Sequence, residues 1–117
     1  MLLVMTFDEI KSLLKSISDP VQRLEAVMDI GKTLPPIPAG CRGVEIKGCA
    51  SKVEIYPAPD GKLYANADSA MVRGIVAILL SIKRAGLAFS EFPALGLDLG
   101  AQRLHGGAAV IEYLESL

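Results

Sequence analysis

Two cysteines and one histidine are the side chains of this chain best suited to nucleophilic or metal chemistry: Cys41, Cys49 and His105. A cysteine reacts as its thiolate, which a nearby positive charge favours. Cys49 has the more distinctive setting of the two thiols, because Gly48-Cys49-Ala50-Ser51 interrupts two alternating apolar and polar runs. From spacing alone, a free cysteine is more often a buried small hydrophobe than a reactive group.

The runs on either side of Cys49 predict strands. Apolar and polar residues alternate over 44–47 and again over 52–56, and such alternation is typical of strands with one face on a core. Gly48 within this pattern indicates a bulge or a tight turn. Residues 57–61, Pro-Ala-Pro-Asp-Gly, have hairpin-turn chemistry, and residues 62–67 return as a third strand. Cys49 is therefore expected on a bent loop between two rigid strands.

Two helices are expected before these strands. Thr6 and Glu9 fit a capping box that begins the first helix. Asp19 and Pro20 begin the second, and Gly31 is expected to end it in the left-handed conformation. The inward stripe of the first helix is predicted as Phe7, Ile10, Leu13, Leu14 and Ile17. That of the second is predicted as Val21, Leu24, Val27, Met28 and Ile30.

Two longer helices are expected after the strands. Asp68 or Ser69 caps a central helix over roughly Ala70 to Ala85, which Gly86 ends. A last helix starts near Ala101. Its inward residues are predicted to be Leu104, Ala108, Ile111 and Leu114, and Gly106-Gly107 suggests close approach of another backbone. Helices on a small antiparallel three-stranded sheet make the fold class α+β, in a single domain over residues 1–117.

The composition excludes several classes of partner. The net charge is −1 with acids and bases interspersed, which leaves no basic surface for nucleic acid or for an anionic membrane. The apolar run 75–80 is far too short to span a bilayer. The N-terminus lacks the pattern of a signal peptide. Two free thiols in the cytoplasm are therefore expected instead of a disulfide.

Four stretches of the chain resemble the SufE family. Gly48-Cys49-Ala50-Ser51-Lys52-Val53 looks like its Gly-Cys-x-Ser-x-Val signature, and residues 30–35 are similar to its Leu-Gly-x-x-Leu-Pro. Residues 67–80 are similar to its helix with the pattern Asp-Ser-x-x-x-Ile-Val-x-Gly-Leu. Gly96-Leu97 and Arg103-Leu104-His105-Gly106 stand where the family has Gly-Leu and Ser-Pro-Ser-Arg-x-Asn-Gly. The stretches follow the family's order from Ile30 onward.

The resemblance implies a function in iron–sulfur cluster assembly. Members of the family accept sulfur from cysteine desulfurases, and they share a small α+β fold with scaffold proteins of the IscU type. Cys49 would then accept sulfur as a persulfide, stimulate the desulfurase, and pass the sulfur to an assembly scaffold or another acceptor. The pyridoxal phosphate belongs to the desulfurase, so no cofactor of its own is expected. Whether such a carrier counts as an enzyme is partly convention.

The resemblance also implies supporting residues. Arg103 matches the family's arginine, and a guanidinium near Cys49 would favour the thiolate; otherwise it is an ordinary surface charge. Asp68 and Ser51 match motif positions, with a helix cap and a loop hydrogen bond as their ordinary roles. His105 replaces the family's asparagine, which favours a structural or partner-facing role. Cys41 has no counterpart in the motif and is taken as a bystander.

Departures from the family and two other functional classes remain open. Glu54 stands where the family usually has Trp, Ala70 replaces a common acid, and Gly100-Ala101-Gln102 replaces Ser-Pro-Ser, which bears on docking to partners.

A metal or iron–sulfur cluster carrier of the IscU-like fold is the first alternative. Only three soft ligands exist and no Cys-x-x-Cys pair, so no metal site is expected. A small redox protein is the second, against which the missing second motif cysteine counts.

Overall fold

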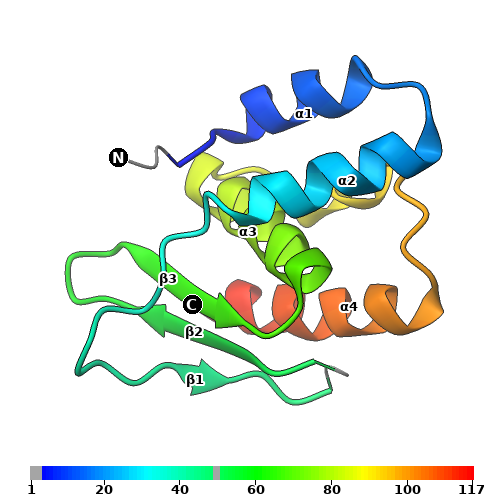
Figure 1. Cartoon of the computed structure of the whole chain (residues 1–117). Helices are drawn as coiled ribbons and strands as arrows, with labels where there is room; N and C mark the ends of the chain where they lie inside the picture. The colour runs from blue at the N-terminus through cyan, green and yellow to red at the C-terminus, as the bar shows by residue number, and fades with distance from the viewer. Residues whose placement is uncertain (1–3, 49–50) are drawn as a thin grey trace.

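The computed structural model describes residues 4–48 and 51–117, with residues 101–103 and 105 described by their backbone alone. The element order is α1 (Phe7–Lys15), α2 (Pro20–Gly31), β1 (Val44–Glu45), β2 (Val53–Pro57), β3 (Leu63–Ala67), α3 (Ala70–Ala85), η1 (Phe89–Glu91), η2 (Pro93–Leu95) and α4 (Ala101–Glu115). The sheet lies on one side of the molecule and α1 with α2 on the other, with α3 between them (Figure 1). The expected α+β class is confirmed.

The sheet is antiparallel with the strand order β1-β2-β3. Val53 pairs with Ala67 at one end of the β2–β3 ladder, and Pro57 pairs with Leu63 at the other. β1 is shorter than predicted, yet the Ile46 amide still donates to the Val53 carbonyl at 2.9 Å and the Ile46 side chain is buried. The predicted core face is confirmed for Ile46, Val53 and Ile55, which are buried, but not for Val44, which is 47% exposed.

α3 is the centre of the core. Ten of its residues are buried, from Met71 to Ile82, because β3 and the other helices contact it on several faces. Ser69, not Asp68, caps its start by accepting from the Val72 amide at 3.3 Å. Gly86 ends it in the left-handed conformation, with a φ of 70°, as predicted. No helix in the described part has the length and apolarity needed to cross a bilayer.

The crossing of α2 and α3 depends on two glycines. A Cβ on Gly74 would come within 2.6 Å of the Val27 side chain, and one on Gly31 within 2.6 Å of the Gly74 amide nitrogen. The prediction of Gly31 as a left-handed cap is wrong, because the helical backbone ends at Lys32 in the right-handed region. Gly31 is therefore required by the lack of space at this crossing, not by a turn of the chain.

The predicted inward face of α4 is also wrong at its start. Leu104 is 49% exposed and Ala108 is exposed, whereas Gly107, Val110 and Leu114 are buried. Packing against other elements determines which residues of α4 are buried. Gly107 faces Phe92 and Ile75, whose side chains would lie 3.8 and 4.0 Å from a Cβ at this position. These neighbours are side chains, so the close backbone approach expected for Gly106-Gly107 does not occur at Gly107.

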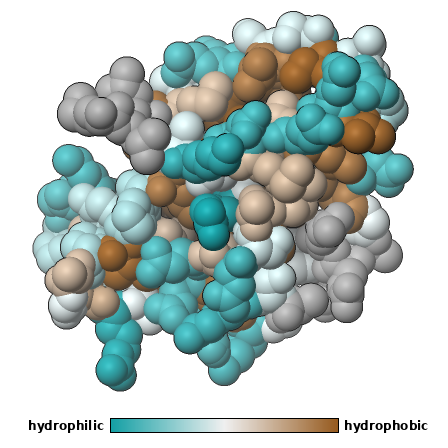
Figure 2. Space-filling model, viewed as in Figure 1, coloured by the Kyte–Doolittle hydropathy of each residue, from teal (hydrophilic) through white to brown (hydrophobic). Residues whose placement is uncertain are grey.

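The first two helices begin as predicted but bury fewer residues. Thr6 and Glu9 form the capping box, and Asp19 accepts from the Gln22 amide. Leu13 and Val21 were predicted inward, yet they are 37% and 63% exposed. Apolar surface accordingly gathers near the α1–α2 connection, at the upper right of Figure 2, while the sheet side is largely hydrophilic.

Candidate functional site

The loop that contains Cys49 joins β1 to β2. The hydrogen bond from the Ile46 amide to the Val53 carbonyl closes its base, so residues 47–52 form the loop. Cys49 and Ala50 lie outside the described residues, and the site is therefore defined by the residues around them. Gly48 has a φ of 90°, a conformation that side chains with a Cβ rarely adopt. The tight turn predicted at Gly48 is confirmed.

The end of the loop is tied to the start of α3. The Asp68 amide donates to the Lys52 carbonyl at 3.2 Å, so the backbone of Asp68 anchors the loop while its side chain is exposed. Arg73, in the first turn of α3, donates to the Ala67 carbonyl at 3.3 Å. Arg73 was not predicted as a site residue. The signal that could have indicated it is a cation one turn after Ser69, the predicted cap of the helix. Together these contacts fix the corner from which the loop projects.

The start of the loop lies against α4. A Cβ on Gly48 would come 3.5 Å from the Cβ of Ala109. A hollow of about 400 Å³ lies beside this contact, lined by Glu45, Ile46, Lys47, Ala109, Glu112, Tyr113 and Ser116. The start of the loop therefore lies against α4, with an open hollow beside it, and the end of the loop is anchored at the start of α3.

Two lysines stand at the ends of the loop. Lys47 pairs with Glu45 at 3.4 Å, and Lys52 pairs with Glu54 at 3.3 Å. Both lysine side chains are mostly exposed, at 88% and 58%, and exposed ion pairs of this kind hold their partners weakly. Either ammonium group is thus free to turn toward an anion that forms on the loop.

Arg103 and His105 are placed by the backbone of α4 alone, and their side chains lie outside the described part. His105 is one turn before Ala109, and positions four apart share a helix face. Arg103 is six residues before Ala109, or about 9 Å along the helix axis at 1.5 Å per residue. α4 begins at Gly100 without a side-chain cap, as expected from the missing Ser-Pro-Ser. The structure brings these positions to the neighbourhood of the loop, and their contact with Cys49 stays a prediction.

Ser51 and Cys41 complete the predicted set. Ser51 is half-buried at the loop's end. Cys41 is an exposed free thiol beside Tyr56, where hydrogen bonding to the sulfur raises the pKa of the phenol. Tyr56 is three residues along β2 from Val53, or about 10 Å from the loop base at the rise of a strand. Cys41 therefore lies toward the other end of the sheet. Over the described residues, no three His, Cys, Asp or Glu side chains gather as metal ligands.

The fold and the loop define a small α+β protein with a cysteine motif on a β-hairpin. Residues 8–117 match the family SufE, an Fe-S metabolism associated domain. The chain belongs to the SufE family, and its function is associated with Fe–S metabolism.

A solved structure of similar fold is the solution structure of a hypothetical protein from Thermus thermophilus. It is 17% identical with a TM-score of 0.66, and the match covers 96% of this chain and 94% of that one. At this identity the likeness concerns the fold alone. No curated protein matches the chain.

Proposed function

We propose that this protein accepts sulfur from a cysteine desulfurase on Cys49, stimulates that enzyme, and delivers the sulfur to an iron–sulfur assembly scaffold or another acceptor. The observation that carries the proposal is the Gly48-Cys49-x-Ser51 motif on the β1–β2 loop of a chain that belongs to the SufE family. As part of the proposal, the activity takes place in the cytoplasm, where thiols are kept reduced.

The proposed transfer is a thiol exchange. The thiolate of Cys49 attacks the outer sulfur of the desulfurase persulfide, a new S–S bond forms on Cys49, and the donor cysteine leaves as its thiolate. No external oxidant is consumed, because the persulfide sulfur keeps its oxidation state. The desulfurase supplies the pyridoxal phosphate chemistry that extracts sulfur from cysteine, so this chain needs no cofactor of its own.

The described residues support such a transfer in two ways. The loop is anchored at both ends, by the Ile46–Val53 and Asp68–Lys52 hydrogen bonds, which limits the entropy lost when a partner's persulfide approaches. Lys47 and Lys52 are exposed cations at the two loop ends, each weakly paired with a glutamate, and an ammonium group that turned toward Cys49 would favour a thiolate over a thiol. The hollow beside Lys47 leaves room for a docking side chain from the donor.

Desulfurase turnover tests the proposal. Alanine release from cysteine should rise when the wild-type protein is added to a desulfurase, and it should rise equally with Cys41→Ser. Cys49→Ser should give no stimulation, because no acceptor thiolate is present. Equal stimulation by Cys49→Ser would show that the protein acts without accepting sulfur on this residue, and the proposal would fail.

A further inference from the structure

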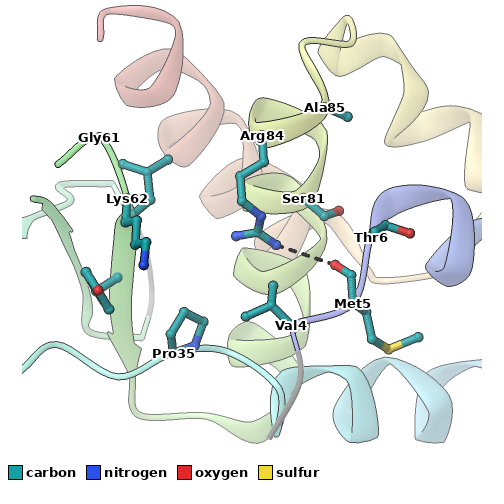
Figure 3. Close-up of a pocket in the computed structure, with 11 residues that line it drawn as sticks. Val4, Met5, Thr6, Pro35, Gly61, Lys62, Ser81, Arg84 and Ala85 are labelled. Atoms are coloured by element: carbon teal, nitrogen blue, oxygen red, sulfur yellow. Dashed lines mark hydrogen bonds between the residues drawn. The ribbon is translucent and has the colours of Figure 1, made fainter.

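A second cavity lies at the opposite end of the sheet from the Cys49 loop. Its volume is about 660 Å³, within the range of about 300–1,000 Å³ that small-molecule sites occupy. It is bounded by residues 4–6, the start of β3 and the last turn of α3 (Figure 3). The lining residues are Val4, Met5, Thr6, Pro35, Gly61, Lys62, Leu63, Tyr64, Ser81, Arg84 and Ala85.

Two cations face this cavity. The ammonium of Lys62, which directly precedes β3, and the guanidinium of Arg84, near the end of α3, extend toward the same space (Figure 3). No carboxylate is among the described lining residues, and the ion pairs of the described chain involve other lysines. Arg84 donates to the Met5 carbonyl at 3.5 Å, a long contact that leaves most of its donors available. Burial lowers the pKa of Arg84 below its usual value, so its charge is already partly removed from water.

The remaining walls are mainly apolar and already in place. Val4, Met5 and Leu63 contribute aliphatic surface. Ser81 is buried and its hydroxyl donates to the Ile78 carbonyl at 2.5 Å, so it offers the cavity no free donor. The capping box at Thr6 holds one wall, and the hydrogen bond from the Ala65 amide to the Pro35 carbonyl, at 3.1 Å, holds another. Binding therefore requires little ordering of the protein.

We propose that this cavity binds a small organic carboxylate with an apolar body. The planar guanidinium of Arg84 is suited to a two-pronged contact with a carboxylate, and Lys62 adds a second positive charge from the facing wall. The aliphatic lining would take the body of the ligand out of water. The site is independent of Cys49, because the β2–β3 turn and the β1–β2 loop lie at opposite ends of β2.

Titration with decanoate tests the proposal. In amide proton–nitrogen correlation spectra of the full chain, decanoate should shift resonances of residues 4–6, the β2–β3 turn and the last turn of α3. The affinity should fall at high ionic strength, because part of it comes from charge attraction. Decanol, which has the same body without the charge, should bind at least about ten-fold more weakly.

Variants separate a built site from general surface attraction. Arg84→Gln and Lys62→Gln should each weaken decanoate binding, the former by about ten-fold. Lys83→Gln removes a neighbouring charge that does not line the cavity, and it should bind as the wild type does. Unchanged spectra outside the variant site would show that the fold is intact. Equal binding of decanol, scattered shifts, or undiminished affinity in the Arg84→Gln, Lys62→Gln double variant would overturn the proposal.

Discussion

At the scale of single residues, the reactivity proposed for Cys49 depends on the positive charges around its loop. Lys47 and Lys52 are the described cations at the two loop ends. Arg103 is the third candidate, because the contact between Gly48 and Ala109 brings α4 to the loop. A cation a few ångströms from a thiol lowers the cost of forming the thiolate, so each of these charges would speed sulfur uptake.

Arg103→Ala should therefore slow sulfur uptake by Cys49 and move its alkylation profile to higher pH. Arg103→Lys should restore part of the effect, since it keeps the charge but loses the planar fork. Stability should change by less than about 0.5 kcal/mol if the side chain is on the surface. Alkylation rates across pH in a Cys41→Ser background provide the measurement. Superimposable profiles with unchanged sulfur uptake would leave Arg103 without a role at the site.

At the scale of elements, the position of the loop depends on how closely α2 and α3 pack. Gly31 and Gly74 let the two helix backbones approach at their crossing, and α3 in turn carries Ser69 and Arg73, which fix the corner next to the loop. A side chain at this crossing would push the helices apart. The loop anchor at Asp68 would then move with α3.

Two glycine variants in helices should change stability in opposite directions. Gly74→Ala places a Cβ against the Val27 backbone and should cost about 3 kcal/mol or more in the free energy of unfolding. Gly107→Ala meets its neighbours at ordinary contact distances of 3.8 and 4.0 Å and should gain about 0.5–1 kcal/mol through helix propensity. Urea unfolding of both variants measures the difference. A stable Gly74→Ala protein would contradict the packing described for this crossing.

The elements themselves could be predicted from the sequence because their signals are local. Thr6, Ser69 and Gly86 mark helix ends by their own hydrogen bonds or backbone angles, and alternation marks the strands. The inward face of α4 could not be predicted, because Gly107 fits against Phe92 and Ile75 from other elements. Periodicity shows that a helix has a buried stripe, but the tertiary neighbours decide which residues form it.

The candidate site was predictable only in part, for the same reason. The Gly-Cys motif and the turn at Gly48 are features of a short stretch, and the structure confirms the turn. The contact of Gly48 with Ala109 and the anchoring of Lys52 by Asp68 join segments distant in sequence. The residue pattern of a single segment cannot predict a contact with a distant segment. Arg73 was missed although its partner, the Ala67 carbonyl, is only six residues away, because a cation near a helix start does not by itself show which carbonyl it contacts.

At the scale of the whole molecule, metal dependence separates a sulfur carrier from a metal or cluster carrier. The protein should melt identically with and without a chelator. A structural zinc site contributes about 10–16 kcal/mol of apparent binding free energy, so its removal would be obvious in a melting curve. Thermal unfolding of protein purified without chelator, before and after treatment, provides the measurement. A large chelator-dependent loss of stability would favour the carrier of metal or clusters.

The central claim is that Cys49 carries the sulfur, and mass spectrometry tests it most directly. The protein is incubated with a cysteine desulfurase and cysteine, digested without reductant, and the peptides containing Cys49 and Cys41 are weighed. The peptide with Cys49 should gain the mass of one or more sulfur atoms, and a thiol reductant should remove the gain. A gain on the Cys41 peptide alone, or on neither peptide while the desulfurase is active, would contradict the account.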